Sequence, residues 1–213
     1  MLTKKYLGIV AYYEECLKHF GDSHLGVDWA SVEAAETRYR VMLDLIRSPP
    51  GQAVTLLDLG CGASHLLDFM VRQQIKGIDY TGLDLSPAFV ALSRQKHPDV
   101  VYYCLDLLES PSTLPHFDYV IMNGVFTQKR DLTVDEMFVY LAALLEKAFA
   151  VARRGVAFNV MSAHLDWERP DLFHLPFDRL AHLLAGLGGN FVLRHDYGLP
   201  EYTVYLYRSQ SAR

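Results

Sequence analysis

The chain has 213 residues, of which 51% are hydrophobic and 21% charged, and its formal net charge is −5 at pH 7. A chain of this length and apolar content can build its own core as one domain, which excludes intrinsic disorder and a fibrous repeat. The 20 basic residues are scattered among 25 acidic ones, so nucleic acid is not expected as a partner.

Cysteine usage and hydropathy indicate a cytoplasmic protein. The three cysteines form no Cys-x-x-Cys pair, so we expect neither a disulfide framework nor a cysteine metal site. The histidines show no shared spacing that suggests metal binding either. No segment approaches the ~20 apolar residues that span a bilayer, and the N-terminus lacks the cleavage site of a signal peptide. We therefore expect no metal and no membrane partner.

The first 48 residues are predicted to form an N-terminal helical cap. Two amphipathic segments, residues 6–17 and 32–46, repeat apolar side chains at spacings of three and four. A turn-rich loop that ends in Trp29 separates them. A Ser-Pro-Pro-Gly run follows, and because its prolines cannot continue a helix we place a domain boundary there. The predicted core comprises residues 49–213.

In this core, strand-like and helix-like segments alternate. Such alternation predicts a parallel sheet that is covered by helices on both faces, which is a three-layer α/β/α sandwich. The expected strands are apolar runs at residues 54–59, 79–85, 100–105, 119–122 and 156–161.

Helix starts can be read from capping residues. Ser64 and Ser86 are placed to cap the helices after the first two strands. Thr133 and Glu136 form a Thr-x-x-Glu capping box, which predicts a helix over residues 134–151.

The C-terminal region differs from the rest of the core. Two β-rich runs, residues 191–197 and 203–207, are separated by only five residues. That is too short for a helical crossover, so the two runs must pair antiparallel. The sheet is therefore predicted to end in an antiparallel hairpin.

Glycine and acidic residues follow the ends of the first three predicted strands. Gly60 and Gly62 let the backbone turn tightly and approach a ligand at the start of the next helix. Asp84 ends the second strand, where a carboxylate can accept hydrogen bonds from both hydroxyls of a ribose. Asp106 ends the third. Because the carboxyl ends of parallel strands face one crevice, the pattern predicts a nucleoside site.

The identity of the nucleoside depends on two positions. A dinucleotide fingerprint needs a third glycine, but the residue at that position is His65. Asp58, just before the glycine turn, suits a ligand with an ammonium group and no phosphates. S-adenosylmethionine has an adenosine, an ammonium group and no phosphate. A nicotinamide-dependent oxidoreductase remains the alternative.

Four short stretches of the core carry a family resemblance. They are LLDLGCGAS (Leu56–Ser64), LDLSP (Leu83–Pro87), Leu105-Asp106-Leu107 and FDYVIMNGVF (Phe117–Phe126). In this order they resemble the motifs of class I S-adenosylmethionine-dependent methyltransferases. The resemblance implies a seven-stranded, mostly parallel sheet in which the last strand inserts antiparallel, as the hairpin already suggested.

The same resemblance implies roles for the residues of the first two motifs. Asp58 would orient the glycine turn and the amino group of the cofactor. The turn of Gly60, Cys61 and Gly62 would bring the backbone to the cofactor, and Asp84 would hold the ribose.

The remaining motifs would surround the two ends of the cofactor. Leu85 and Leu107 would sandwich the adenine, and Asp106 would accept a hydrogen bond from its exocyclic amine. Asn123 would lie near the methionyl part. From the cap, Arg38 is expected to meet the cofactor's carboxylate, and Trp29 to help exclude water.

The predicted activity is methyl transfer to a small molecule by in-line displacement, with S-adenosylhomocysteine as product. Asn123-Gly124-Val125-Phe126 differs from the (Asp/Asn)-Pro-Pro-(Tyr/Phe) motif of the enzymes that methylate amino groups of DNA bases. His164 is the candidate general base, since its reference pKa of ~6.5 lies near working pH. A binding domain without catalysis remains a further alternative, and the N-terminal helices could form a homodimer contact.

Overall fold

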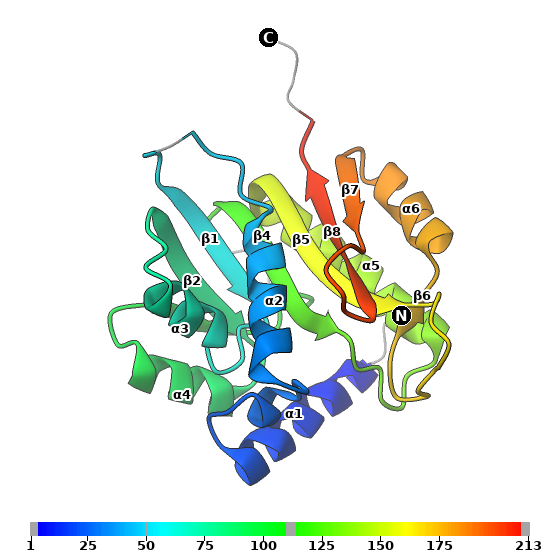
Figure 1. Ribbon diagram of the computed structural model, residues 1–213, viewed down its shortest axis with the longest axis horizontal. Coiled ribbons are helices and arrows are strands. Elements are labelled where there is room, and N and C mark those ends of the chain that lie inside the picture. Colours follow the sequence, from blue (N-terminus) through cyan, green and yellow to red (C-terminus); the bar gives the residue numbers. More distant parts are fainter. Residues whose placement is uncertain (1–3, 50, 110–113, 210–213) are drawn as a thin grey trace.

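A computed structural model describes residues 4–49, 51–109 and 114–209. Residues 1–3 of the predicted cap and Pro50 at the predicted boundary lie outside the described residues, as do 110–113 and 210–213. The described chain forms three layers, with a twisted sheet between two sets of helices (Figure 1).

The sheet follows the order β3-β2-β1-β4-β5-β8-β7, and β6 pairs with β5 beside this path. All described pairs are parallel except β5–β8 and β7–β8, so β8 runs opposite to the other strands. The predicted α/β sheet with one antiparallel strand from a C-terminal hairpin is confirmed. Its strands are β1 (Val54–Leu59), β2 (Ile78–Asp84), β3 (Val101–Cys104), β4 (Phe117–Phe126), β5 (Ala152–Ser162), β6 (His174–Leu175), β7 (Asn190–Arg194) and β8 (Glu201–Tyr207).

Helices cover both faces of the sheet. The helices α2 (Val32–Leu43), α3 (His65–Arg72) and α4 (Pro87–Lys96) contribute to one buried apolar cluster, and α5 (Val134–Val151) and α6 (Phe177–Gly186) contribute to the other. The side chains of β1 alternate between them, because Leu56 joins the first cluster while Leu57 and Leu59 join the second.

The N-terminal segment does not pack as one unit. The helix α1 (Leu7–Phe20), preceded by the 3₁₀ turn η1 (Lys4–Tyr6), lies across the lower edge in Figure 1, toward which the arrows of β1 and β4 point. After a second 3₁₀ turn, η2 (Leu25–Val27), α2 instead packs against the sheet beside α3. Of the two N-terminal helices, α1 therefore stands over the carboxyl ends of the strands and α2 packs on the sheet face. The division into a cap and a core stays a prediction.

Two of the three predicted helix caps are as expected. The Ser86 hydroxyl accepts from the Phe89 amide at 3.2 Å, and Thr133 and Glu136 form the reciprocal capping box. Ser64 was wrongly predicted to cap α3. It adopts left-handed backbone angles (φ +58°), and its hydroxyl forms hydrogen bonds with the hydroxyls of Ser93 and Tyr102 instead.

The remaining differences lie where local sequence signals are weak. The helix α6 and the two-residue strand β6 were not predicted, and β4 and β5 are longer than expected. Among the residues that the structure describes, no helix combines the length and the apolar character that crossing a membrane requires.

Candidate active site

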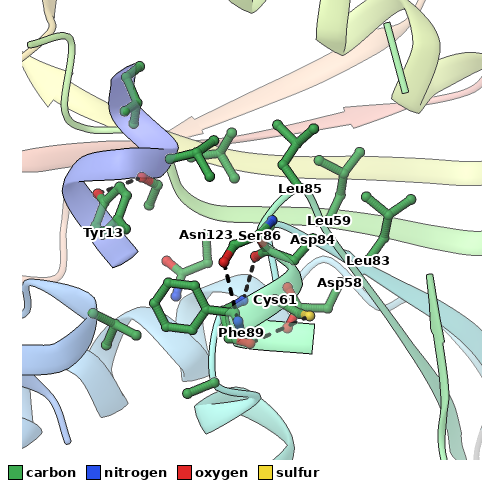
Figure 2. A pocket seen from close by; sticks show the side chains of 18 of the residues that line it. Tyr13, Asp58, Leu59, Cys61, Leu83, Asp84, Leu85, Ser86, Phe89 and Asn123 are labelled. Carbon is green, nitrogen blue, oxygen red and sulfur yellow. Dashed lines mark hydrogen bonds between the residues drawn. The ribbon is translucent and has the colours of Figure 1, made fainter. Parts of the chain in front are cut away.

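A cavity lies at the carboxyl ends of β1 to β4, beneath α1. It encloses about 1100 Å³, part of which is open to solvent. Its walls come from α1, the loop 27–29, the turn after β1, the ends of β2, β3 and β4, and the α5 residues Tyr140 and Leu144. Figure 2 shows Tyr13 of α1 on one side and Asp58 and Leu83 on the other. A parallel sheet offers a crevice for ligands at this edge.

Ten of the eleven residues that the sequence analysis assigned to the cofactor line this cavity. Strand ends and turns that are far apart in the chain therefore converge on one space. The ten are Trp29, Asp58, Gly60, Cys61, Gly62, Asp84, Leu85, Asp106, Leu107 and Asn123.

The turn after β1 requires glycine at two positions. Gly60 and Gly62 have φ angles of +80° and +51°, which side-chain-bearing residues rarely adopt. A Cβ added to Gly60 would also lie 2.5 Å from Cγ2 of Val125 on β4. The amide of Gly60 donates to the Leu83 carbonyl at 2.7 Å, which fastens the turn to β2. The backbone therefore forms the cavity wall here.

Asp84 joins this turn to the end of β2. Its Oδ2 accepts from the Gly62 amide at 2.8 Å, and its Oδ1 accepts from the Ser86 amide at 2.8 Å. Burial raises the pKa of Asp84, although these backbone donors counteract the effect. Since each carboxylate oxygen can accept more than one hydrogen bond, Asp84 retains acceptor capacity toward the cavity.

Asp58 is more deeply buried than Asp84. Only 3% of its surface is exposed, and its Oδ2 accepts from the Tyr80 hydroxyl at 2.8 Å. Burial raises the pKa of Asp58 to about 7, with a contribution from the negative charge of Asp84 and against the hydrogen bond from Tyr80. A cation in the cavity would favour its ionised form.

One end of the cavity is apolar apart from Asp106. Leu85 and Leu107 line it from the ends of β2 and β3. The carboxylate of Asp106 accepts from the Tyr6 hydroxyl at 2.6 Å and from the Leu108 amide at 2.9 Å. The Tyr6 contact was not predicted, because nothing in the local sequence pairs an N-terminal tyrosine with a residue 100 positions away.

Asn123 lines the cavity from the C-terminal part of β4. Within the described part of the chain, its buried side-chain oxygen has no hydrogen-bond partner. A buried acceptor without a donor is unfavourable by about 1–3 kcal/mol, so this atom fits a ligand that brings a donor. Trp29 packs close by, against the Cα of Gly124.

The helix α1 is held to three strand ends. Besides the Tyr6–Asp106 bond, the Ser86 hydroxyl donates to Glu14 at 2.5 Å, and the Tyr13 hydroxyl donates to the Gly124 carbonyl at 3.4 Å. Ile9 and Val10 add apolar lining. These residues were assigned to the cap but not to the site. Their amphipathic spacing was the available signal.

Two predicted site residues are not among those that line the cavity. Arg38 is buried behind Trp29, where its Nε and Nη2 donate to Glu201 at 2.7–2.9 Å. His164 is exposed in the segment after β5, where its ring packs at a tilt of 42° against Phe177 with centroids 4.8 Å apart.

Comparison with protein families places a methyltransferase domain within the chain. A family model described as a methyltransferase domain matches residues 57–153, which run from β1 to the start of β5. No curated protein sequence matches the chain.

Solved structures share the fold at low sequence identity. Magnesium protoporphyrin IX methyltransferase from Synechocystis PCC 6803, with bound S-adenosylmethionine, is 14% identical with a TM-score of 0.68, covering 96% of this chain and 97% of that chain. The 1,6-didemethyltoxoflavin-N1-methyltransferase from Burkholderia thailandensis is 16% identical with a TM-score of 0.65, covering 99% and 92%. A TehB-like methyltransferase from Corynebacterium glutamicum is 15% identical with a TM-score of 0.55, covering 96% and 98%.

The domain match and the fold agree with the motifs that the cavity brings together. They show that residues 57–153 match a methyltransferase domain and that the chain shares its fold with methyltransferases that bind S-adenosylmethionine.

Proposed function

We propose that this methyltransferase binds S-adenosylmethionine in the cavity beneath α1 and transfers the methyl group to a small-molecule acceptor. The observation that carries this proposal is the 2.8 Å hydrogen bond from the Gly62 amide to Asp84. This bond holds the glycine turn, where the backbone can contact a ligand, beside the Asp84 carboxylate, which can bind a ribose. Adenosine binding needs both.

The adenosine half of the cofactor fits the ends of β2 and β3. The unused acceptor positions of Asp84 suit the two ribose hydroxyls. Leu85 and Leu107 offer apolar surfaces for the adenine faces, and Asp106 can accept from its exocyclic amine.

The methionyl half fits the turn after β1 and the end of β4. Gly60 and Gly62 leave room for the chain of the amino acid, and Asp58 offers a negative charge to its ammonium group. The unpartnered oxygen of Asn123 can accept a hydrogen bond from the same group.

Several features favour a small acceptor. The cavity is lined mainly by apolar and aromatic side chains, and α1 covers it, which limits access for a macromolecule. The net charge of −5 also disfavours nucleic acid. The toxoflavin-precursor and protoporphyrin enzymes with this fold are named for small substrates, in agreement with the proposal.

In this mechanism the protein acts mainly by alignment. S-adenosylmethionine supplies a methyl group on a positively charged sulfur, which is already reactive toward a nucleophile. Asp84, Asp58 and Asn123 would fix its position, while Tyr13 and Trp29 would keep water away from the reacting atoms. A general base is needed only where the acceptor must lose a proton. The exposed position of His164 gives its assignment as that base no geometric support.

Calorimetry with S-adenosylhomocysteine tests cofactor binding directly, and NAD serves as the control. Binding of NAD alone would favour the oxidoreductase alternative. Incubation with S-adenosylmethionine and a panel of small thiols, amines, phenols and carboxylic acids, followed by mass spectrometry, tests the transfer. Cofactor binding without any methylated product across such panels would favour a non-catalytic domain.

Cytoplasmic location and a homodimer are the remaining proposals from the sequence. The three cysteines are free thiols, which agrees with a reducing compartment. Phe20, Leu25 and Val32 expose 43–54% of their surface and could contribute to a dimer contact. Light scattering at several protein concentrations tests the dimer.

A further inference from the structure

A chain of buried polar contacts runs from α2 to the cavity. The guanidinium of Arg38 donates through Nε and Nη2 to Glu201 at the start of β8. The Glu201 carboxylate also accepts from the side-chain amide of Asn159 on β5 at 2.7 Å, and the Asn159 oxygen accepts from the Gly124 amide at 2.7 Å. We call Arg38, Glu201 and Asn159 the Arg38 network.

The Arg38 network holds Gly124 from two sides. Its hydrogen bonds end on the Gly124 amide, and the Arg38 guanidinium also stacks on Trp29, 4.2 Å from the ring centroid. The Trp29 ring in turn lies 2.7 Å from the place that a Cβ on Gly124 would take. Gly124 has a φ of +79°, so both contacts depend on glycine at this position.

Stability alone is a weak reason for such an arrangement. Glu201 and Asn159 are 1% and 0% exposed, and an ion pair at that depth pays a large desolvation penalty. Well-packed apolar residues of similar volume often stabilise a fold as well as a buried ion pair does. The network ends at the backbone next to Asn123, whose side chain lines the cavity. This placement connects it to the site.

We propose that Arg38, Glu201 and Asn159 are positioning residues, which set the end of β4 so that Asn123 and Gly124 meet the methionyl part of the cofactor. This inference rests on the proposed binding of S-adenosylmethionine. It also assigns Arg38 a role different from the expected contact with the cofactor's carboxylate. Arg38 does not line the cavity, and it acts through Glu201 and Asn159.

Two ligands distinguish positioning from general damage to the fold. S-adenosylhomocysteine carries the amino-acid part, whereas 5′-methylthioadenosine has the adenosine and sulfur without it. Asn159→Leu should weaken the binding of S-adenosylhomocysteine by about tenfold or more, which is the loss expected from one misplaced buried hydrogen bond. Binding of 5′-methylthioadenosine should stay within about twofold of the wild type, because Asp84 and the adenine end are unaffected.

Thr203→Val is the matched control. Thr203 lies opposite Asn159 on β8, is 1% exposed, and bonds Tyr197 rather than the Arg38 network. It should leave both affinities unchanged. If Asn159→Leu does not fold, as judged by circular dichroism, Glu201→Gln replaces it and should show the same ligand difference to a smaller degree.

The proposal is overturned if Asn159→Leu lowers the affinity for both ligands equally or leaves both affinities unchanged. It is also overturned if Thr203→Val produces the same difference between the two affinities. A wild-type protein that binds neither ligand would instead refute the proposed cofactor site itself. The two failures are therefore distinguishable in one titration series.

Discussion

The hydroxyl of Tyr6 donates a 2.6 Å hydrogen bond to the carboxylate of Asp106, which follows β3. Burial and the adjacent Asp106 raise the pKa of Tyr6, so its phenol stays protonated and remains a donor at neutral pH. The Tyr6 ring also stacks on Tyr140 of α5, with centroids 5.0 Å apart. The start of the chain thus completes the wall at the proposed adenine end of the cavity.

Removing the Tyr6 hydroxyl should free the Asp106 side chain while the aromatic ring still fills its place in the wall. We expect Tyr6→Phe to weaken S-adenosylhomocysteine binding severalfold, because Asp106 loses the donor that fixes it, a contact of about 1.5–3 kcal/mol for a charged acceptor. Tyr6→Ala should weaken binding further and lower the melting temperature. Calorimetry and thermal denaturation measure both. Equal affinities in Tyr6→Phe and the wild type would mean that Asp106 does not need Tyr6.

Replacing Asp84 should have a large effect on the cofactor. Asp84→Ala is expected to weaken the binding of S-adenosylhomocysteine at least tenfold, since a buried charged hydrogen bond contributes ~1.5–3 kcal/mol. Asp79→Ala, at an exposed position of the same strand, is the control and should bind normally. Unchanged affinity in Asp84→Ala would remove this carboxylate from the site.

The raised pKa of Asp58, about 7, predicts a pH dependence of binding. An ammonium group favours the ionised carboxylate, so affinity for S-adenosylhomocysteine should increase as pH rises from 5.5 toward about 7.5. Asp58→Asn should lose most of this increase. Titration calorimetry across that range is the measurement, and a wild-type affinity independent of pH would contradict the prediction.

The same group affects the stability of the ligand-free protein. The folded pKa lies above the unfolded value of ~3.9, so the folded state holds a proton that the unfolded state has lost between these pH values. The contribution of Asp58 to the free energy of unfolding is therefore fully present below pH ~4 and is lost as pH rises through about 7. Chemical denaturation at pH 5 and pH 8 measures this effect. From pH 5 to pH 8, the free energy of unfolding should decrease less in Asp58→Asn than in the wild type.

Thr127 offers a test of an unsatisfied buried group. Within the described residues, its buried hydroxyl oxygen has no hydrogen-bond partner. Thr127→Val removes that oxygen at nearly constant volume, so the ligand-free protein should keep or raise its melting temperature. Thr203→Val removes a hydroxyl that is bonded to Tyr197 and should destabilise by about 0.5–1.5 kcal/mol. A large loss of stability in Thr127→Val would reveal a partner for its hydroxyl, such as a bound water.

His164 can be tested once an acceptor is known. Because His164 is exposed, packs against Phe177 and does not line the cavity, we expect His164→Ala to retain the wild-type affinity for S-adenosylhomocysteine. Turnover should change less than about tenfold, below the contribution of a typical general base. A larger loss, together with loss of the acidic limb of the pH–rate profile, would restore the general-base prediction.

Local signals predicted much of the fold. The apolar run Val54–Leu59 is a strand with the predicted bounds, and the capping box at Thr133 begins the predicted helix. The short connection before β8 forced an antiparallel hairpin. These features depend on neighbouring residues, so the sequence alone was sufficient. The two-residue β6 depends on pairing with β5, which no local pattern records.

The site was predictable only in part for the same reason. Glycines and carboxylates at strand ends follow from topology, and they line one cavity. The ion pair of Arg38 and Glu201 joins residues 163 positions apart in the sequence, and the Tyr6–Asp106 bond joins residues 100 positions apart. Arg38 and Asp106 were singled out in the sequence, but their partners Glu201 and Tyr6 look like ordinary strand and helix residues there.

The reversed direction of β8 has a geometric consequence for the C-terminal part of the chain. Glu201 begins β8 and pairs with Met161, near the carboxyl end of β5. Had β8 run parallel to β5, its first residue would lie at the opposite rim of the sheet, roughly 20 Å away at ~3.3 Å per residue. Because β8 is inverted, its first residue rather than its last lies at the edge of the sheet where the cavity is.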